Sequence, residues 1–115
     1  EVNATRPDGS SALLLAALGG HSSTVNELIS LGANVHHTKA NGATALFAAA
    51  AADAVECVQA LHDAGAVADA PNTHGVTPLQ MAAHKNNGRS LRMLLRLGAD
   101  PCAADNAANT ALHKA

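Results

Sequence analysis

The chain has 115 residues, a formal net charge of −2 and a single aromatic residue, Phe47. Its other apolar residues are rich in alanine, with leucine, valine, isoleucine and methionine, so the composition favours thin, close-packed layers over a thick core of large side chains. Charge is unevenly placed along the sequence, since residues 1–70 are acidic and residues 71–115 are basic.

The sequence repeats itself with a period of 33 residues. Residues 75–83 have degraded copies 33 residues away in both directions, without an insertion. Thr77, for example, corresponds to Ser11, Thr44 and Thr110. Self-similarity at a fixed period predicts an array of stacked structural units.

Each predicted repeat opens with a tight turn. The turn pairs are Asp8-Gly9, Asn41-Gly42 and His74-Gly75. Asp-Gly and Asn-Gly are strong tight-turn signals, so we expect a hairpin-like finger in each repeat. Residues 1–5 align with the tail of a repeat, and the chain is therefore expected to begin inside an array.

A short helix should follow each finger. The predicted N-caps, whose hydroxyls can accept from the free amides of the first turn, are Ser11, Thr44, Thr77 and Thr110. Pro78 suits the first helical position, where a missing N–H costs nothing. The helix should end near Gly20, with Asp53 and Asn86 at the equivalent positions, because these residue types tolerate a left-handed backbone.

A second, amphipathic helix should complete each repeat. Its apolar stripe is predicted at Val25, Leu28 and Ile29, then Val58, Leu61 and His62, then Leu91, Leu94 and Leu95. His62 is the one polar residue in this stripe. Gly32, Gly65 and Gly98 are expected to end these helices. Residues 109–115 should begin a fourth first helix.

The motif Gly75-x-Thr77-Pro78-Leu79-x-x-Ala82-Ala83, with Gly20-His21, Leu28-Ile29 and Gly98-Ala99-Asp100 at the same period, resembles the ankyrin repeat. The resemblance implies an all-α, L-shaped α-solenoid of helix-turn-helix units with hairpin-like fingers. It implies three full repeats (residues 6–38, 39–71 and 72–104), a partial fourth (105–115) and the tail of an upstream repeat (1–5). We therefore expect a fragment of a longer ankyrin-repeat protein.

The sequence also departs from the family pattern. The family's usual histidine after Thr-Pro-Leu occurs only as His113, while Leu14, Phe47 and Gln80 stand at the equivalent positions. The Thr-to-His hydrogen bond should therefore be mostly absent. Alanine also replaces the proline after Ser11 and Thr44. Repeats 1 and 2 should consequently be looser than a consensus array.

The resemblance implies a scaffold that binds another protein through its concave face, formed by the finger tips and the first helices. The alternative is a regulatory or targeting module of a larger enzyme, channel or ubiquitin-ligase adaptor. The family's variable positions fall on Pro7, Asp8, Ser10, Ala40, Asn41, Ala43, Thr73, His74, Val76, Asn106 and Asn109 in the fingers, and on Leu18, Ala51, His84 and Lys85 in the first helices. These residues are the predicted protein-binding site, weighed against the simpler interpretation that they are solvated turns and helix ends.

A basic stripe, Arg89, Arg92 and Arg96, suggests either nucleic acid or an acidic peptide as a ligand. Nucleic-acid binding usually also needs stacking aromatic residues, which this region lacks. One period earlier stand Glu56 and Asp63. We therefore predict cross-repeat ion pairs of Glu56 with Arg89 and of Asp63 with Arg96, and no nucleic-acid partner.

Catalytic, metal and cofactor sites are not expected. His36, Asp69 and Cys102 occupy equivalent positions one repeat apart, too far from one another to share a zinc ion. Cys57 falls beside the second-helix core, where we expect a packed thiol and no nucleophile. Hydroxylation of an inter-repeat asparagine occurs in the family and would fall on Asn3.

Compartment and association can also be predicted. Cys57 and Cys102 have no metal or redox spacing, so we expect free thiols in a reducing compartment and an intracellular protein, cytoplasmic or nuclear. The alanine-rich run at residues 48–52 is too short for membrane insertion. Without polar caps, the array should be marginally stable and associate weakly through its apolar ends.

Overall fold

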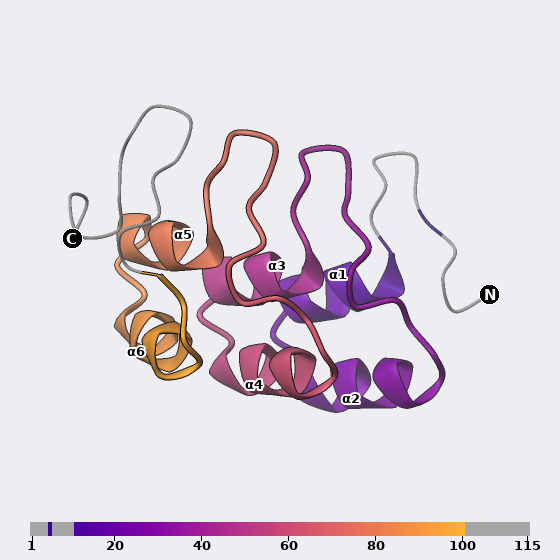
Figure 1. The fold of residues 1–115 in the computed structure, drawn as a ribbon. Helices are drawn as coiled ribbons and strands as arrows, with labels where there is room; N and C mark the ends of the chain where they lie inside the picture. Colours follow the sequence, from indigo (N-terminus) through magenta and orange to yellow (C-terminus); the bar gives the residue numbers. More distant parts are fainter. Residues whose placement is uncertain (1–4, 6–10, 101–115) are drawn as a thin grey trace.

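A computed structural model describes residue 5 and residues 11–100. This part of the chain contains three helix pairs: α1 (Ala12–Leu18) with α2 (Ser22–Ser30), α3 (Ala45–Ala51) with α4 (Val55–Asp63), and α5 (Pro78–His84) with α6 (Gly88–Arg96). The odd-numbered helices form one row and the even-numbered helices a second row (Figure 1). Connecting loops rise beyond the first row as fingers (Figure 1). The predicted all-α solenoid is confirmed.

The first helices begin where the hydroxyl residues predicted. The side chains of Ser11, Thr44 and Thr77 each accept a hydrogen bond from the backbone N–H three residues later, at 3.2–3.3 Å. Pro78 occupies the first turn of α5, as expected. Each cap satisfies one of the amides that a helix start leaves without a partner.

Gln80, which stands where the family has histidine, bonds to the N-cap residue Thr77. Its Oε1 accepts from the backbone N–H of Thr77 at 2.8 Å, while the Thr77 hydroxyl accepts from the Gln80 N–H. The Gln80 side chain is buried, with 1% exposure. This pair of hydrogen bonds is a capping box. It stands in place of the Thr-to-His hydrogen bond that the family's usual histidine would make.

The ends of the first helices also follow the prediction. Gly20, Asp53 and Asn86 have φ values of +74°, +55° and +61°. Asp and Asn tolerate this left-handed conformation better than other side-chain-bearing residues, at a cost of roughly 1 kcal/mol. The same backbone turn therefore joins the two helices of every pair.

The core lies between the two rows of helices. Val25, Val58, Leu61 and Leu94 of the second row have no exposed surface. His62, the polar residue of the apolar stripe, lies at the border of this core, and its side chain is half-buried. A polar residue in the apolar stripe is tolerated there because its ring edge can reach water.

Polar side chains connect the second and third helix pairs. The Asp53 carboxylate accepts from the Ser90 N–H at 3.0 Å and from the Ser90 hydroxyl at 2.8 Å. The Asn87 amide donates to the backbone carbonyls of Ala50 at 2.9 Å and Ala51 at 3.1 Å. These bonds satisfy carbonyls at the C-terminal end of α3 and fasten α6 to it.

The first and second helix pairs have different residues at these positions. Gly20 corresponds to Asp53, Ala54 to Asn87 and Cys57 to Ser90. Neither Gly20 nor Ala54 has a polar side chain, so the same bonds cannot form there. The contact between the first and second helix pairs therefore lacks these polar bonds, while the looser packing of repeats 1 and 2 stays a prediction.

One of the two predicted cross-repeat ion pairs is present. Arg89 Nη2 lies 3.9 Å from Glu56 Oε2, and both side chains are more than half exposed. The pair between Asp63 and Arg96, two residues that the structure describes, is not formed, so this prediction is wrong. Asp63 instead accepts from Gln59 Nε2 at 2.8 Å, one turn earlier in α4. Gln59 and Asp63 stand four residues apart on one helix and are therefore neighbours on its surface, whereas a pair with Arg96 would be an exposed ion pair of small net benefit.

Candidate functional site

The second finger (residues 39–43) is a tight, internally bonded turn. The Gly42 N–H donates to the Lys39 carbonyl at 2.8 Å, and the Lys39 N–H donates to the Ala43 carbonyl at 3.1 Å. The Asn41 Oδ1 accepts from the Ala43 N–H at 3.0 Å. Gly42 has a φ of +83°, which favours glycine. The finger therefore holds its side chains at defined positions.

The third finger (residues 72–76) has the same construction. The Gly75 N–H donates to the Asn72 carbonyl at 3.0 Å, and the Asn72 N–H donates to the Val76 carbonyl at 2.9 Å. The Asn72 Oδ1 accepts from the N–H groups of His74 and Val76, at 2.9 and 3.1 Å. As a result, His74 is presented at an exposed tip.

The second and third fingers are joined to one another. Both the backbone N–H and the hydroxyl of Thr73 donate to the Asn41 carbonyl, at 2.9 and 3.0 Å. A Cβ atom at Gly42 would come within 2.7 Å of the Thr73 nitrogen, so glycine is also needed for this close approach. The two fingers therefore form one continuous, rigid surface.

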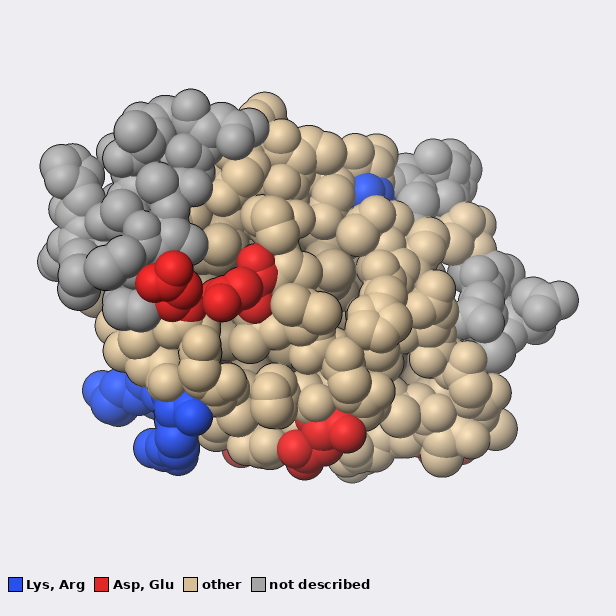
Figure 2. Space-filling view, in the orientation of Figure 1, with Lys and Arg blue, Asp and Glu red and all other residues tan. Residues whose placement is uncertain are grey.

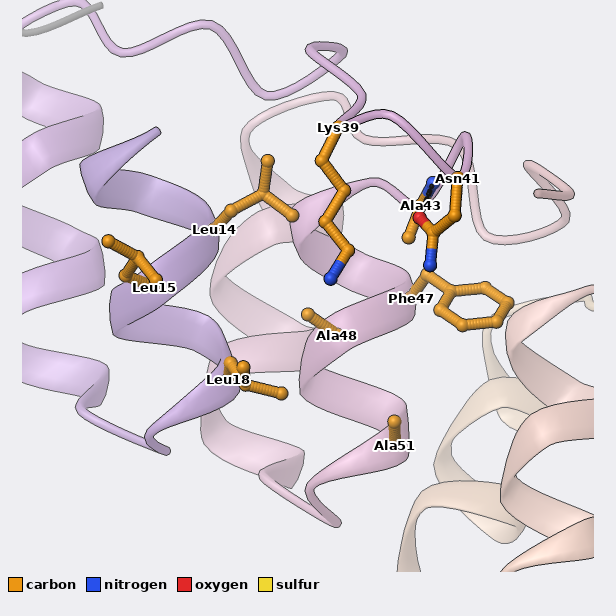
Figure 3. A pocket seen from close by; sticks show the side chains of 9 residues that line it. All are labelled: Leu14, Leu15, Leu18, Lys39, Asn41, Ala43, Phe47, Ala48 and Ala51. Atoms are coloured by element: carbon orange, nitrogen blue, oxygen red, sulfur yellow. Dashed lines mark hydrogen bonds between the residues drawn. The ribbon is translucent and has the colours of Figure 1, made fainter. Parts of the chain in front are cut away.

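A pocket of about 110 Å³ opens where the second finger meets α1 and α3 (Figure 3). Of the described residues that line it, all except Lys39 and Asn41 are apolar. The lining consists of Leu14, Leu15, Leu18, Lys39, Asn41, Ala43, Phe47, Ala48 and Ala51. This arrangement, a mostly apolar hollow with a few polar groups at defined places, is typical of ligand-binding sites.

The apolar wall of the pocket is graded from buried to exposed. Leu14 and Ala48 are buried, with 3% and 8% exposure. Leu15 and Leu18, on the same helix as Leu14, are 39% and 52% exposed. Fully burying an exposed leucine contributes about 1.5–3 kcal/mol, and covering these half-exposed leucines would contribute roughly half of that. The pocket therefore has apolar surface at its edge that a partner could still bury.

Lys39 is the charged residue of the pocket. Its side chain is half-buried and points from the second finger into the space between Leu14 and Ala48 (Figure 3). Its ammonium forms no ion pair with any residue that the structure describes. A cation thus lies against an apolar wall without an acidic neighbour from residue 5 or residues 11–100.

The predicted binding residues lie in the pocket, on the fingers outside it, at the end of α5, or outside the described residues. Leu18, Asn41, Ala43 and Ala51 line the pocket. Ala40, Thr73, His74 and Val76 lie on the two fingers outside its lining, and His84 and Lys85 are exposed at the end of α5. Pro7, Asp8, Ser10, Asn106 and Asn109 lie outside the described residues, as do Asn3 and Cys102.

The structure adds lining residues that were not among the predicted ones. These are Leu14, Leu15, Lys39, Phe47 and Ala48. Leu14 and Phe47 stand at the position of the family's histidine, and both side chains line the pocket. The signal for this wall is the spacing of Leu14 and Leu15 from Leu18, four and three residues, which makes each of them a neighbour of Leu18 on the helix surface.

Two other hollows lie elsewhere on the described surface. One, of about 300 Å³, includes His84, Asn86 and Asn87 at the end of α5. The other, of about 520 Å³, is an open groove along α4 that includes Glu56, Asp63 and Met93. Figure 2 shows positive charge gathered over α6 and negative charge over the neighbouring α4 region. Neither hollow combines a buried apolar wall with a fixed finger.

Cys57 is buried with no exposed surface, as predicted for a packed thiol. Burial raises the pKa of this thiol, and the neighbouring Glu56 carboxylate raises the pKa further. A raised pKa disfavours the thiolate, which is the nucleophilic form. The environment of Cys57 therefore opposes a catalytic role.

Of the three equivalent positions considered for a metal site, the structure describes His36 and Asp69. Asp69 accepts from the backbone N–H of Asp100, at 3.1 and 3.2 Å for its two oxygens. His36 is exposed. Among the described residues, no three His, Cys, Asp or Glu side chains are grouped closely enough to bind a metal ion together.

No helix in residues 11–100 has both the length and the apolar character needed to cross a bilayer.

Comparison with known proteins agrees with the architecture. The family model of ankyrin repeats, in three copies, matches residues 13–105. A search among curated proteins finds no match to this chain. Ankyrin repeats generally act as protein–protein interaction modules and typically have no catalytic activity. With this match over most of its length, the chain belongs to the ankyrin-repeat family.

Proposed function

We propose that this array is a scaffold that holds another protein against its concave face, formed by the finger tips and the first helices. The observation that carries the proposal is the pocket between α1, α3 and the second finger. Four of the positions predicted from the sequence line this one hollow: Leu18, Asn41, Ala43 and Ala51. The remaining predicted positions would extend the contact along the fingers and towards α5.

Rigidity of the fingers favours such a role. Binding is weakened by the entropy of ordering loops, so a surface that is already ordered loses less on association. The bonds from Thr73 to the Asn41 carbonyl join the two described fingers before any partner arrives. Exposed Leu18 then supplies the apolar anchor that interfaces usually need near their centre.

A module that positions a substrate for a larger enzyme, channel or ubiquitin-ligase adaptor would use the same face. The free, buried Cys57 supports a reducing, intracellular setting, cytoplasmic or nuclear. The repeat boundaries and the weak self-association through the array ends stay predictions.

The test is a selection of phage-displayed random heptapeptides on the immobilised chain. The strongest peptides would then be measured against Leu18→Arg and against Leu31→Arg, a matched control at another exposed leucine. Leu31 follows the end of α2, outside the concave face. We expect Leu18→Arg to weaken binding about tenfold or more and Leu31→Arg to leave it unchanged. Equal binding to both variants would exclude the pocket as the contact site.

A further inference from the structure

The chemistry of the pocket points to a particular class of partner. Its volume is about 110 Å³, whereas an apolar cavity of about 150 Å³ admits benzene. The space therefore suits one aliphatic side chain. The wall that would surround this side chain consists of Leu14, Leu18 and Ala48.

Lys39 adds a requirement for charge. Its backbone is held by two hydrogen bonds of the second finger, and its side chain extends from there over the pocket (Figure 3). Among the described residues, none of those that line the pocket is acidic. A carboxylate placed beside an ammonium over an apolar wall is attracted more strongly than on an open, fully solvated surface. The pocket therefore complements an aliphatic group with a carboxylate next to it.

We propose that the pocket binds an extended peptide segment of a partner protein, in which an aliphatic residue stands next to an aspartate or glutamate. This inference rests on the proposed function. The aliphatic side chain enters between α1 and α3, and the carboxylate pairs with Lys39. Asn41, at the mouth of the same pocket, offers a side-chain amide to the peptide backbone.

The peptide selection described above can test this class directly, with wild type, Lys39→Glu and Arg92→Glu as immobilised targets. Arg92→Glu makes the same charge change on exposed α6, away from the pocket. We expect wild type and Arg92→Glu to enrich an aliphatic residue beside an acidic one. Lys39→Glu should keep the aliphatic preference and replace the acidic preference by a basic one.

A double-mutant cycle then assigns the contact to the two groups. The best acidic peptide and its amide analogue, with Glu replaced by Gln or Asp by Asn, would be measured by fluorescence anisotropy against wild type and Lys39→Gln. Either single change should weaken binding about tenfold, and the second change should add little to the first. Circular dichroism of each variant would confirm that the helices are intact.

The outcomes separate this inference from the proposed function. Peptides that depend on Leu18 but show no acidic preference and no response to Lys39 would overturn the inference and leave the concave face as the binding site. Peptides that ignore Leu18 and Lys39 alike, or a selection that enriches none, would overturn both.

Discussion

The carboxylate of Asp53 accepts two hydrogen bonds from Ser90, one from the backbone N–H at 3.0 Å and one from the hydroxyl at 2.8 Å. Asp53 lies in the turn between α3 and α4, and Ser90 lies in the first turn of α6, the second helix of the next pair. In an array, stability comes largely from such contacts between neighbours. The bond therefore makes the turn residue Asp53 contribute to the stability of the contact between the second and third helix pairs.

Replacing Ser90 should show how much this bond contributes. Ser90→Ala removes a buried hydroxyl that donates to a carboxylate, so we expect the free energy of unfolding to fall by about 1.5 kcal/mol. Urea unfolding followed by circular dichroism measures the change. Ser30→Ala is the matched control, because the Ser30 hydroxyl bonds only exposed carbonyls of its own helix, and it should change stability by less than about 0.5 kcal/mol. Equal effects of the two variants would contradict the assigned role.

The same bond can be introduced between the first and second helix pairs. Gly20→Asp with Cys57→Ser places the two partners at the corresponding positions. A Cβ atom at Gly20 would meet only the Ala54 Cβ, at 3.7 Å, so space is available. Gly20→Asp alone should cost about 1 kcal/mol for the left-handed backbone, and Cys57→Ser alone about 1–3 kcal/mol for a buried hydroxyl without a partner.

In the double variant these two losses should not add. We expect the combined loss to be smaller than the sum of the single losses by about 1–2 kcal/mol, because the new hydroxyl finds the new carboxylate. Urea unfolding of the four proteins completes the cycle. Simple additivity would mean that the two positions are not in hydrogen-bonding register in the N-terminal pairs.

The buried thiol of Cys57 predicts slow alkylation. In a Cys102→Ser background, which leaves Cys57 as the sole thiol, iodoacetamide at pH 8 should react about 100-fold more slowly with the folded chain than with the urea-unfolded chain. Because folding raises the pKa of this thiol, the unfolded chain loses the proton first as the pH rises. Cys57 should therefore lower stability above about pH 9 and have no such effect near neutrality. Rapid alkylation of the folded chain would contradict the buried assignment.

The far end of the proposed contact surface can be tested at α5. His84 and Lys85 are exposed and lie apart from the pocket, so they should act as rim residues. His84→Ala and Lys85→Glu should each weaken peptide or partner binding by less than about 1 kcal/mol, against at least about 1.4 kcal/mol for Leu18→Arg. Affinity measurements on the three variants rank them. Undiminished binding in both α5 variants would remove these residues from the site.

Much of the fold could be predicted because its signals are local and recur. Thr44 and Thr77 cap helices, Pro78 starts one, and Gly20, Asp53 and Asn86 turn the chain through the left-handed region. Each of these depends on a residue's own backbone preference, which does not need knowledge of distant neighbours.

The contacts that the sequence does not predict depend on which side chains meet in the folded chain and compete for the same neighbour. Asp63 was paired with Arg96 from their equivalent positions, yet Gln59 in the same helix bonds it at 2.8 Å. Lys39 was not recognised as a site residue because only the folded second finger carries it over α1 and α3. Exposed or half-exposed side chains of this kind select among several available neighbours, so sequence position alone does not determine their contacts.

The central claim, that the pocket between α1, α3 and the second finger receives a partner's peptide, is tested most directly by NMR titration. The ¹⁵N-labelled chain would be titrated with the strongest selected peptide, and amide shift changes would be mapped by residue. We expect the largest changes at Leu14, Leu18, Lys39, Asn41 and Ala51, with small changes along α2 and α6. Changes concentrated on the α4 groove around Glu56 and Asp63, or on the arginines of α6, would contradict the claim.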